Sequence, residues 1–132
     1  MANPNHKFAH AYLEAVSAGE LPDSLLTPDM TAWGTTLGPV SKAAYQKMIR
    51  LLARICATPI QFVVDAITAE EDRVLVEAHS TATLISGEPY SNTYVFSIRI
   101  RDGRIAWIAE HYNAEIVQQK LLPLMAKLQA IR

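Results

Sequence analysis

Side chains that could line a small-molecule site, most of them aromatic or polar, recur at every second position between residues 90 and 101. The even positions are Tyr90, Asn92, Tyr94, Phe96, Ile98 and Ile100. Successive side chains of a strand point to opposite faces, and the odd positions are mostly serine, threonine and arginine, so the even set predicts the inner face of a sheet. An apolar wall with a few convergent polar groups is the usual lining of a small-molecule site. There Tyr94 could donate a hydrogen bond to a substrate carbonyl that becomes an enolate, or it could be a large core residue.

The two strands beside this one supply further candidates. Alternation within residues 73–85 puts Ser80 on the inner face, among small apolar side chains, and puts Glu77 and His79 on the outer face. The last strand, residues 104–112, is apolar on both faces, so both faces need a cover. One face of it carries Ile108, Glu110 and Tyr112, and the other carries Trp107 and His111.

Helical elements precede these strands. Apolar residues at helical spacing predict a first helix that ends at Gly19 and a second helix over residues 41–56. Between them we expect a short helical turn between two prolines and a short strand, residues 30–36, that carries Trp33.

From residue 60 onward the hydrophobic period is two, which predicts four antiparallel strands joined by turns. Asp102–Gly103 is the strongest hairpin signal, because both positions of such a turn need positive φ. Residues 113–132 are expected to form a helical tail with a break at Pro123. Helices that come before a run of strands indicate a single α+β domain over residues 1–132.

Composition excludes several classes of function. Twelve basic and thirteen acidic residues in a chain of 132 leave a net charge near zero, and no basic patch suggests nucleic-acid binding. No apolar run approaches the ~20 residues of a membrane helix, and the start lacks a signal-peptide pattern. The lone cysteine, Cys56, favours a reducing compartment, so we expect a cytoplasmic protein. No phosphate loop, dinucleotide fingerprint or metal-ligand cluster is present, so we expect no metal and no organic cofactor.

Several segments, in their order and spacing, resemble the NTF2-like superfamily, and within it the SnoaL-like polyketide cyclase and ketosteroid isomerase-like group. They are Tyr12 in the first helix, residues 19–22, residues 28–33, residues 87–94, and residues 102–105 leading into 110–113. The resemblance implies a cone-shaped fold, in which N-terminal helices pack on a strongly curved mixed or antiparallel sheet around a pocket, and usually a homodimer. It implies no single reaction, because the fold hosts isomerases, cyclases, dehydratases, epoxide hydrolases and binding modules.

The resemblance also places Glu110 on the inner face, because an acid precedes the aromatic residue at the end of this strand in the SnoaL-like pattern. A carboxylate beside Ile108, Phe96 and Tyr94 would be desolvated, which raises its pKa toward a useful acid–base range. The alternative is a buried carboxyl group with a structural role.

The remaining polar groups of the inner face have two interpretations each. Tyr112, like Tyr94, could polarise a substrate oxygen or be a core residue bonded to Glu110. Asn92 could orient a substrate or the acid, or make a structural hydrogen bond. Tyr12 and Trp33 are expected to join the pocket wall, which Phe96, Ser80 and Ile108 complete.

The histidines are assigned to other surfaces. His6 and His10 lie one helical turn apart, but nothing at ligand spacing joins them, so we expect a solvated face. His79 and His111 fall on the outer face, where Trp107 is expected to contribute to a homodimer interface together with Val95. A shift of one residue would instead bring both histidines into the pocket as acid–base groups.

Two departures from the group narrow the chemistry. Epoxide hydrolases of this fold carry an arginine and an aspartate where this chain has Ala78 and Ser80, and the oxyanion pair of the steroid isomerases has no full match. The sequence therefore predicts a pocket for a small hydrophobic molecule. We expect a cofactor-independent isomerase, cyclase or dehydratase that acts on a carbonyl compound, with Glu110 moving the proton. The alternative is a non-catalytic module that binds a small apolar ligand, or a dimeric domain without catalysis.

Overall fold

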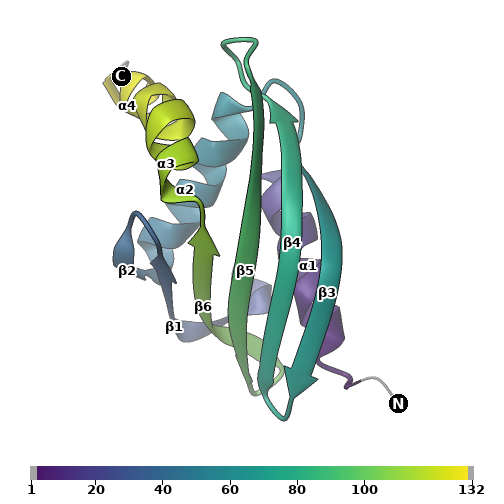
Figure 1. Ribbon diagram of the computed structural model, residues 1–132. Helices are drawn as coiled ribbons and strands as arrows, with labels where there is room; N and C mark the ends of the chain where they lie inside the picture. The colour runs from purple at the N-terminus through teal and green to yellow at the C-terminus, as the bar shows by residue number, and fades with distance from the viewer. Residues whose placement is uncertain (1–2, 131–132) are drawn as a thin grey trace.

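The computed structural model describes residues 3–130. Its helical segments are α1 (His6–Ala18), η1 (Asp23–Leu25), α2 (Lys42–Ile55), α3 (Ala114–Ile116), η2 (Val117–Leu121) and α4 (Leu122–Ala130). Its strands are β1 (Leu26–Gly34), β2 (Gly38–Ser41), β3 (Gln61–Glu70), β4 (Arg73–Thr83), β5 (Pro89–Arg101) and β6 (Arg104–Tyr112) (Figure 1). Residues 1–2 and 131–132, which the sequence analysis assigned to the domain and its tail, lie outside the described residues.

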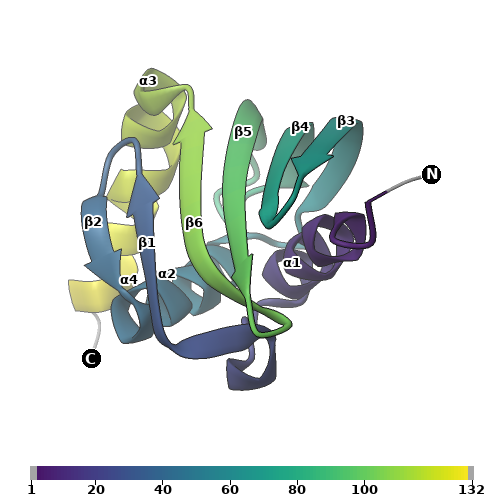
Figure 2. The same ribbon diagram turned by 90° about the horizontal axis from the view of Figure 1, so that it is seen from below.

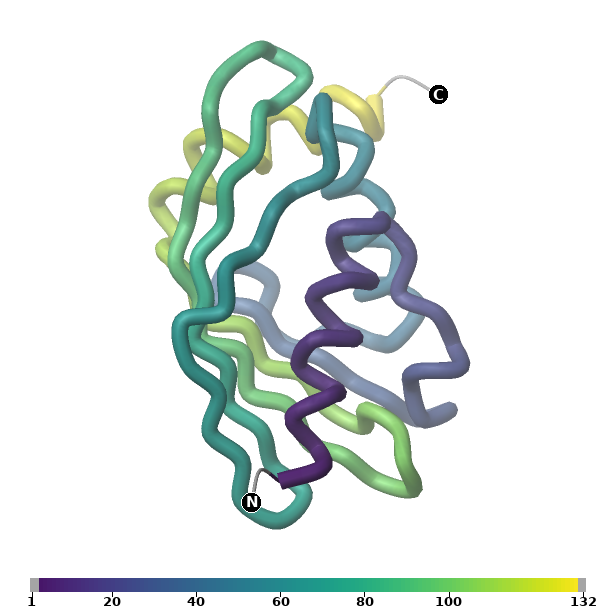
Figure 3. The backbone as a smooth tube through the Cα atoms, turned by 90° about the vertical axis from the view of Figure 1, so that its right-hand side faces the viewer, coloured from purple at the N-terminus to yellow at the C-terminus, as the bar shows by residue number. Residues whose placement is uncertain are grey.

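The described strands form one curved sheet in the order β2-β1-β6-β5-β4-β3. The strands β1 and β6 run parallel, and all other neighbours run antiparallel. The helices lie on one side of the sheet (Figure 2), and the sheet bows away from α1 when the molecule is seen from the side (Figure 3). This is the α+β architecture that the sequence pattern predicts, with the cone shape that the family resemblance implies.

Buried apolar faces stabilise the helices, and capping residues define where they begin and end. In α1, Phe8, Tyr12 and Val16 recur at helical spacing and are buried. Gly19 ends this helix with a φ of 84°, and a Cβ at that position would lie 2.7 Å from the Cβ of Ala53 in α2. Glycine therefore permits both the left-handed turn and the close approach of the two helices. In α2, the Ser41 hydroxyl caps the first turn by accepting a hydrogen bond from the Ala44 N–H at 3.2 Å.

Alternation along the strands sorts the side chains as the sequence analysis predicts. In β5, Tyr90, Asn92, Phe96, Ile98 and Ile100 are buried, and the residues between them are mostly exposed. The β5–β6 turn has positive φ at both central residues, 53° at Asp102 and 71° at Gly103. The register pairs Ser80 of β4 with Asn92, and Phe96 with Glu110 of β6, so these side chains share one face.

The structure corrects three local predictions. The first strand begins at Leu26 instead of residue 30, and the segment after the turn at residues 35–37 forms β2, which was not predicted. The tail does not break at Pro123. The helical backbone continues from η2 into α4, and the wider hydrogen-bonding pattern of the π-helical turn just before Pro123 accommodates a residue without an N–H.

Candidate functional site

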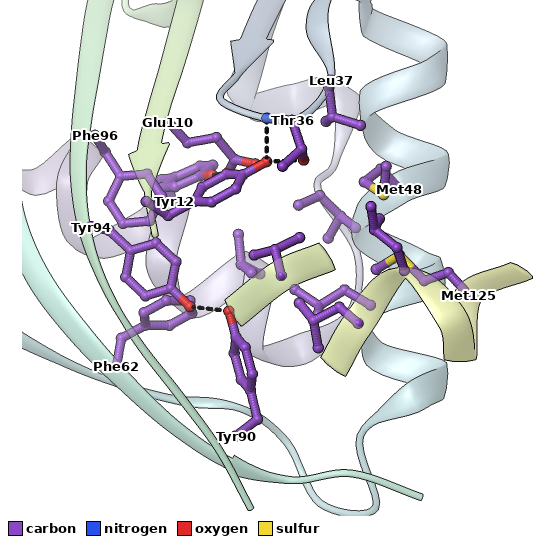
Figure 4. Close-up of a pocket in the computed structure, with 17 residues that line it drawn as sticks. Tyr12, Thr36, Leu37, Met48, Phe62, Tyr90, Tyr94, Phe96, Glu110 and Met125 are labelled. Atoms are coloured by element: carbon purple, nitrogen blue, oxygen red, sulfur yellow. Dashed lines mark hydrogen bonds between the residues drawn. The ribbon is translucent and has the colours of Figure 1, made fainter. Parts of the chain in front are cut away.

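An apolar pocket lies between the inner face of the sheet and the helices (Figure 4). It has a volume of about 630 Å³, counting its open mouth. Its lining comprises Tyr12, Val16, Thr36, Leu37, Met48, Ile49, Leu52, Phe62, Tyr90, Tyr94, Phe96, Glu110, Tyr112, Val117, Leu121, Leu122 and Met125. Of the described residues, those that line this pocket include no lysine, arginine or histidine, and Glu110 is their only carboxylic acid. A pocket of this composition suits a neutral, mostly apolar molecule.

Two tyrosines from two helices hold one oxygen of Glu110. The Tyr45 hydroxyl donates to Oε2 at 2.9 Å, and the Tyr12 hydroxyl lies 3.4 Å from the same oxygen. The hydroxyls of Tyr12 and Tyr45 also contact each other. Both tyrosines are buried, with 1% and 0% of their surface exposed, so these hydrogen bonds are shielded from water. The carboxyl group is therefore oriented from behind by α1 and α2.

The other oxygen of Glu110 is unoccupied by protein donors. Within residues 3–130, no group donates a hydrogen bond to Oε1. Gly34 of β1 lies opposite Glu110 in the parallel pairing, and a Cβ at Gly34 would come within 3.5 Å of Oε1. The absence of a side chain at residue 34 thus leaves space beside this oxygen. Because Glu110 lines the pocket, Oε1 is the oxygen that a bound molecule can reach.

Burial raises the pKa of Glu110 from its usual 4.5 to about 7. The two tyrosine hydrogen bonds act in the opposite direction, because they favour the ionised carboxylate, but they offset only part of the desolvation. Burial also raises the pKa of Tyr12 and of Tyr45, and the negative charge of Glu110 adds to this, so both remain hydrogen-bond donors. Near neutral pH, Glu110 can therefore accept a proton and return it.

Tyr112 lies on the same side of the pocket as the free oxygen of Glu110. Its hydroxyl oxygen would be 3.4 Å from a Cβ at Gly34, the position that also approaches Oε1. The Thr36 N–H donates to the Tyr112 hydroxyl at 3.1 Å, and the Thr36 hydroxyl lies 2.5 Å from it. Burial raises the pKa of Tyr112. Tyr112 is thus a positioned, neutral hydroxyl close to the acid.

Tyr94 belongs to a different group of polar side chains. Its hydroxyl contacts the Ser80 hydroxyl at 2.7 Å and the Tyr90 hydroxyl at 3.2 Å. Its ring stacks on Phe96 with the centroids 5.2 Å apart, and Phe96 meets Tyr12 edge to face at 5.3 Å. In Figure 4, the hydroxyls of Tyr90 and Tyr94 meet across the pocket from Glu110 and Thr36. An aromatic wall therefore separates two polar ends.

Apart from Trp33, the predicted site residues divide into three groups. Those that line the pocket are Glu110, Tyr94, Tyr112, Tyr12 and Phe96. Ser80 and Asn92 are buried behind the wall and bond to its tyrosines, whereas Ile108 lies on the inner face but is fully buried in the core.

The prediction that Trp33 joins the pocket wall is wrong. Gly34 pairs with Glu110, so Trp33, one residue earlier, has the opposite parity and pairs with Ala109. Its ring lies 5.0 Å from that of His111, which is exposed on the outer face.

Tyr45, Thr36 and Gly34 also belong to the site, although the sequence pattern does not predict them. Tyr45 lies on the apolar face of α2. A buried tyrosine hydroxyl usually needs a hydrogen-bond partner, and this is the signal that could have identified it. Nothing in the local sequence marks Thr36 or Gly34, because their roles depend on the pairing of β1 with β6.

The histidines of the strands lie outside the pocket. His79 Nδ1 is 2.9 Å from the Asp65 carboxylate at a partly exposed position, and His111 is exposed beside Trp33. This confirms the outer-face assignment over the shifted alternative. Across residues 3–130, no cluster of three or more His, Cys, Asp or Glu side chains is placed to hold a metal ion. Within the same described range, no helix is both long and apolar enough to cross a membrane.

Comparison with solved structures gives the same fold at low sequence identity. AclR from Streptomyces galilaeus, a putative hydroxylase, is 24% identical with a TM-score of 0.75, over 96% of this chain and 92% of that chain. IdmH from Streptomyces antibioticus, a putative polyketide cyclase, is 18% identical with a TM-score of 0.75, over 90% and 99% of the two chains. A LEH-like epoxide hydrolase from M. tuberculosis is 15% identical with a TM-score of 0.69, over 96% and 95%.

Comparison with proteins of curated function gives no match. A family model described as the SnoaL-like domain matches residues 9–108, which is most of the chain. This stretch covers α1 from Ala9 onward, all of α2 and β1 to β5, and β6 as far as Ile108. The chain therefore belongs to the SnoaL-like domain family.

Proposed function

We propose that this small-molecule pocket protein is a cofactor-independent acid–base enzyme, of the isomerase, cyclase or dehydratase type, that acts on a hydrophobic carbonyl compound. One observation carries the proposal. Glu110 lines the pocket and has one oxygen held by two buried tyrosines, whereas its other oxygen receives no hydrogen bond from any group of the described residues. A purely structural carboxyl group would be expected to have both oxygens bonded by the protein.

In the proposed mechanism, each group at the acid end of the pocket has its own role. Glu110 Oε1 removes a proton from the carbon next to a substrate carbonyl, and the electron pair of that C–H bond moves toward the carbonyl oxygen. The Tyr112 hydroxyl donates a hydrogen bond to this oxygen as its negative charge grows. Glu110 then returns the proton to another position of the substrate. Tyr12 and Tyr45 stabilise the carboxylate between these steps, because they favour its ionised form.

Tyr112 suits the polarising role better than Tyr94, because Tyr112 and Oε1 lie against the same side of Gly34. The sequence alone does not distinguish between these two tyrosines. Tyr94 is bonded to Ser80 and Tyr90 at the opposite polar end. Hydrolysis of an epoxide is not proposed, since Ala78 and Ser80 are uncharged and buried at the positions where that chemistry would need charged side chains.

A non-catalytic binding module is the second candidate. The observation that favours it is that the Tyr112 and Tyr94 hydroxyls already have protein partners, so neither requires a substrate. A binding module would take up apolar ketones but would not accelerate any reaction at carbon.

Exchange of hydrogen for deuterium next to a carbonyl separates the two candidates. Aromatic methyl ketones such as 2-acetonaphthone are incubated with the protein in D₂O, and deuterium in the methyl group is followed by mass spectrometry. The enzyme hypothesis predicts protein-catalysed exchange that Glu110→Gln lowers by at least ~100-fold, while binding of the ketone is retained and the melting temperature does not fall. Binding without exchange across a panel of such ketones would instead support the binding module.

Two further proposals concern the protein's setting. We propose a homodimer through the outer face of the sheet, where Val63, Leu75 and Val95 are exposed by 51%, 42% and 38%. We also propose a cytoplasmic location, which the single free cysteine, Cys56, supports.

A further inference from the structure

The second polar end of the pocket consists of a chain of hydroxyls anchored by one amide. Tyr90, Asn92 and Tyr94 lie on the inner face of β5, and Ser80 lies beside them on β4. The contacts run from Asn92 Nδ2 to the Tyr90 hydroxyl at 3.1 Å, from there to the Tyr94 hydroxyl at 3.2 Å, and on to the Ser80 hydroxyl at 2.7 Å. Tyr90 and Tyr94 line the pocket, whereas Asn92 and Ser80 have 4% and 1% of their surface exposed.

Backbone contacts determine which way the Asn92 amide points. Its Oδ1 accepts hydrogen bonds from the N–H groups of Thr93 at 2.8 Å and Asn113 at 3.1 Å. Its Nδ2 must then supply the donors, to the Asn113 carbonyl at 3.2 Å and to the Tyr90 hydroxyl. The Tyr90 hydroxyl is therefore an acceptor toward Asn92, and its own hydrogen is directed elsewhere.

Counting hydrogens shows that this group has a donor left over. Tyr90, Tyr94 and Ser80 each have one hydroxyl hydrogen, but only two contacts join the three hydroxyls. The Ser80 hydroxyl is buried and has no other partner within residues 3–130, so its hydrogen is best used toward Tyr94. Whichever of Tyr90 and Tyr94 donates to the other, one of these two tyrosines keeps a hydrogen for which the described residues offer no acceptor. Both of them face the pocket.

The surroundings decide what can accept this hydrogen. No lysine, arginine or histidine is among the described residues that line the pocket, and Glu110 at the other end can carry a negative charge, so a second anion is disfavoured. Between the two ends the wall is aromatic, with Phe96 and Phe62 against the Tyr94 ring. A neutral acceptor oxygen on an apolar body fits these constraints.

We propose that the Tyr90–Tyr94 pair is a second binding site for substrate, which donates a hydrogen bond to a neutral ether or carbonyl oxygen remote from the reacting carbonyl. This inference rests on the proposed function for the position of the reacting end. The substrate class is accordingly a flat or elongated apolar ketone with a second acceptor oxygen at its far end.

Two ketones of nearly the same shape test the inference by binding alone. They are 6-methoxy-2-acetonaphthone and 6-ethyl-2-acetonaphthone, which differ by one ether oxygen, and their dissociation constants are measured by fluorescence titration. A pocket without a free donor must favour the ethyl compound, because burying an unpaired ether oxygen is costly. We expect the wild-type protein to bind the methoxy compound at least as tightly as the ethyl compound.

Substitution of the two tyrosines by phenylalanine tests which hydroxyls donate the hydrogen bond. Tyr90→Phe and Tyr94→Phe each leave one hydroxyl hydrogen free, so each single variant should retain much of the preference. The double variant removes both hydroxyls and should shift the ratio of dissociation constants toward the ethyl compound by about fivefold to tenfold, the range of one hydrogen bond. Tyr112→Phe is the matched control, since it removes a tyrosine hydroxyl at the other polar end and should keep the ratio.

Several results would overturn the inference. A wild-type protein that prefers the ethyl compound, a ratio that survives in a folded double variant, or failure to bind either ketone would each do so. If the double variant does not fold, the ratio of the two dissociation constants for the wild-type protein still tests the inference. Failure of the proposed function has a different signature, because Glu110→Gln would then leave deuterium exchange unaffected, whereas the methoxy preference does not depend on that residue.

Discussion

Glu110 should make the stability of the protein depend on pH in a defined direction. The folded protein holds the carboxyl proton with a pKa of about 7, against the ordinary value of 4.5, because the charged form is desolvated. Below about pH 4.5 the group is protonated in both the folded and the unfolded chain. As the pH rises toward 7, the unfolded chain releases the proton more readily, so the stability contributed by this group is progressively lost.

The gap between the two pKa values sets the size of the effect. It corresponds to about 3 kcal/mol of unfolding free energy, lost between about pH 4.5 and about pH 8. Glu110→Gln is neutral at every pH, and its side-chain oxygen can still accept from Tyr45 and Tyr12. The variant should therefore lack this pH-dependent loss and, near pH 8, unfold at a higher urea concentration than the wild type.

Urea titrations followed by tryptophan fluorescence measure both proteins across this pH range at one protein concentration. The matched control is Glu14→Gln, which removes the same charge from an exposed position on α1. The difference between wild type and Glu110→Gln should grow by about 3 kcal/mol with rising pH, whereas the control should follow the wild type. Parallel curves for wild type and Glu110→Gln would show that the carboxyl group is not desolvated, and would refute the reasoning.

Three further predictions address the surroundings of this acid. Tyr45→Phe removes a hydrogen bond that favours the carboxylate, so the pKa of Glu110 should rise further and the pH–rate profile of deuterium exchange should move to higher pH; an unmoved profile would contradict this. Gly34→Ala adds a methyl group 3.5 Å from Oε1, with the flexible Leu37 side chain as its tightest contact at 3.2 Å, so exchange should fall at least ~10-fold while the melting temperature changes by a few degrees. Light scattering should give a dimer that Val95→Asp dissociates, and a monomeric wild type at micromolar concentration would count against the interface.

The sequence predicts which strands of the sheet are neighbours along the chain and which of their faces is buried. It does not predict how segments far apart in the chain pack together. Alternation in β4 and β5, together with the Asp102–Gly103 turn, determines both register and inner face, because a shift by one residue would turn every apolar side chain outward. The parallel pairing of β1 with β6 is different. It joins segments about 75 residues apart, as the contact between Thr35 and Glu110 shows, and no local pattern specifies such a partner. The error at Trp33 follows directly from this missing register.

The same difference between local pattern and long-range packing applies to the site. Local pattern and family resemblance together identify Glu110, Tyr94, Tyr112, Tyr12 and Phe96 as pocket residues, since each lies on a face that alternation or helical spacing can assign. Sequence pattern and resemblance identify Glu110 only as one carboxyl group. In the structure, the two oxygens of this group have different surroundings. Tyr45 donates to Oε2 across 65 positions of sequence and contacts the Tyr12 hydroxyl across 33. Gly34, from yet another element, leaves space at Oε1. The chemical capacity of Glu110 therefore arises from the convergence of α1, α2, β1 and β6 on one side chain. A change at any of these partners should alter its proton affinity or its accessibility without altering the acid itself.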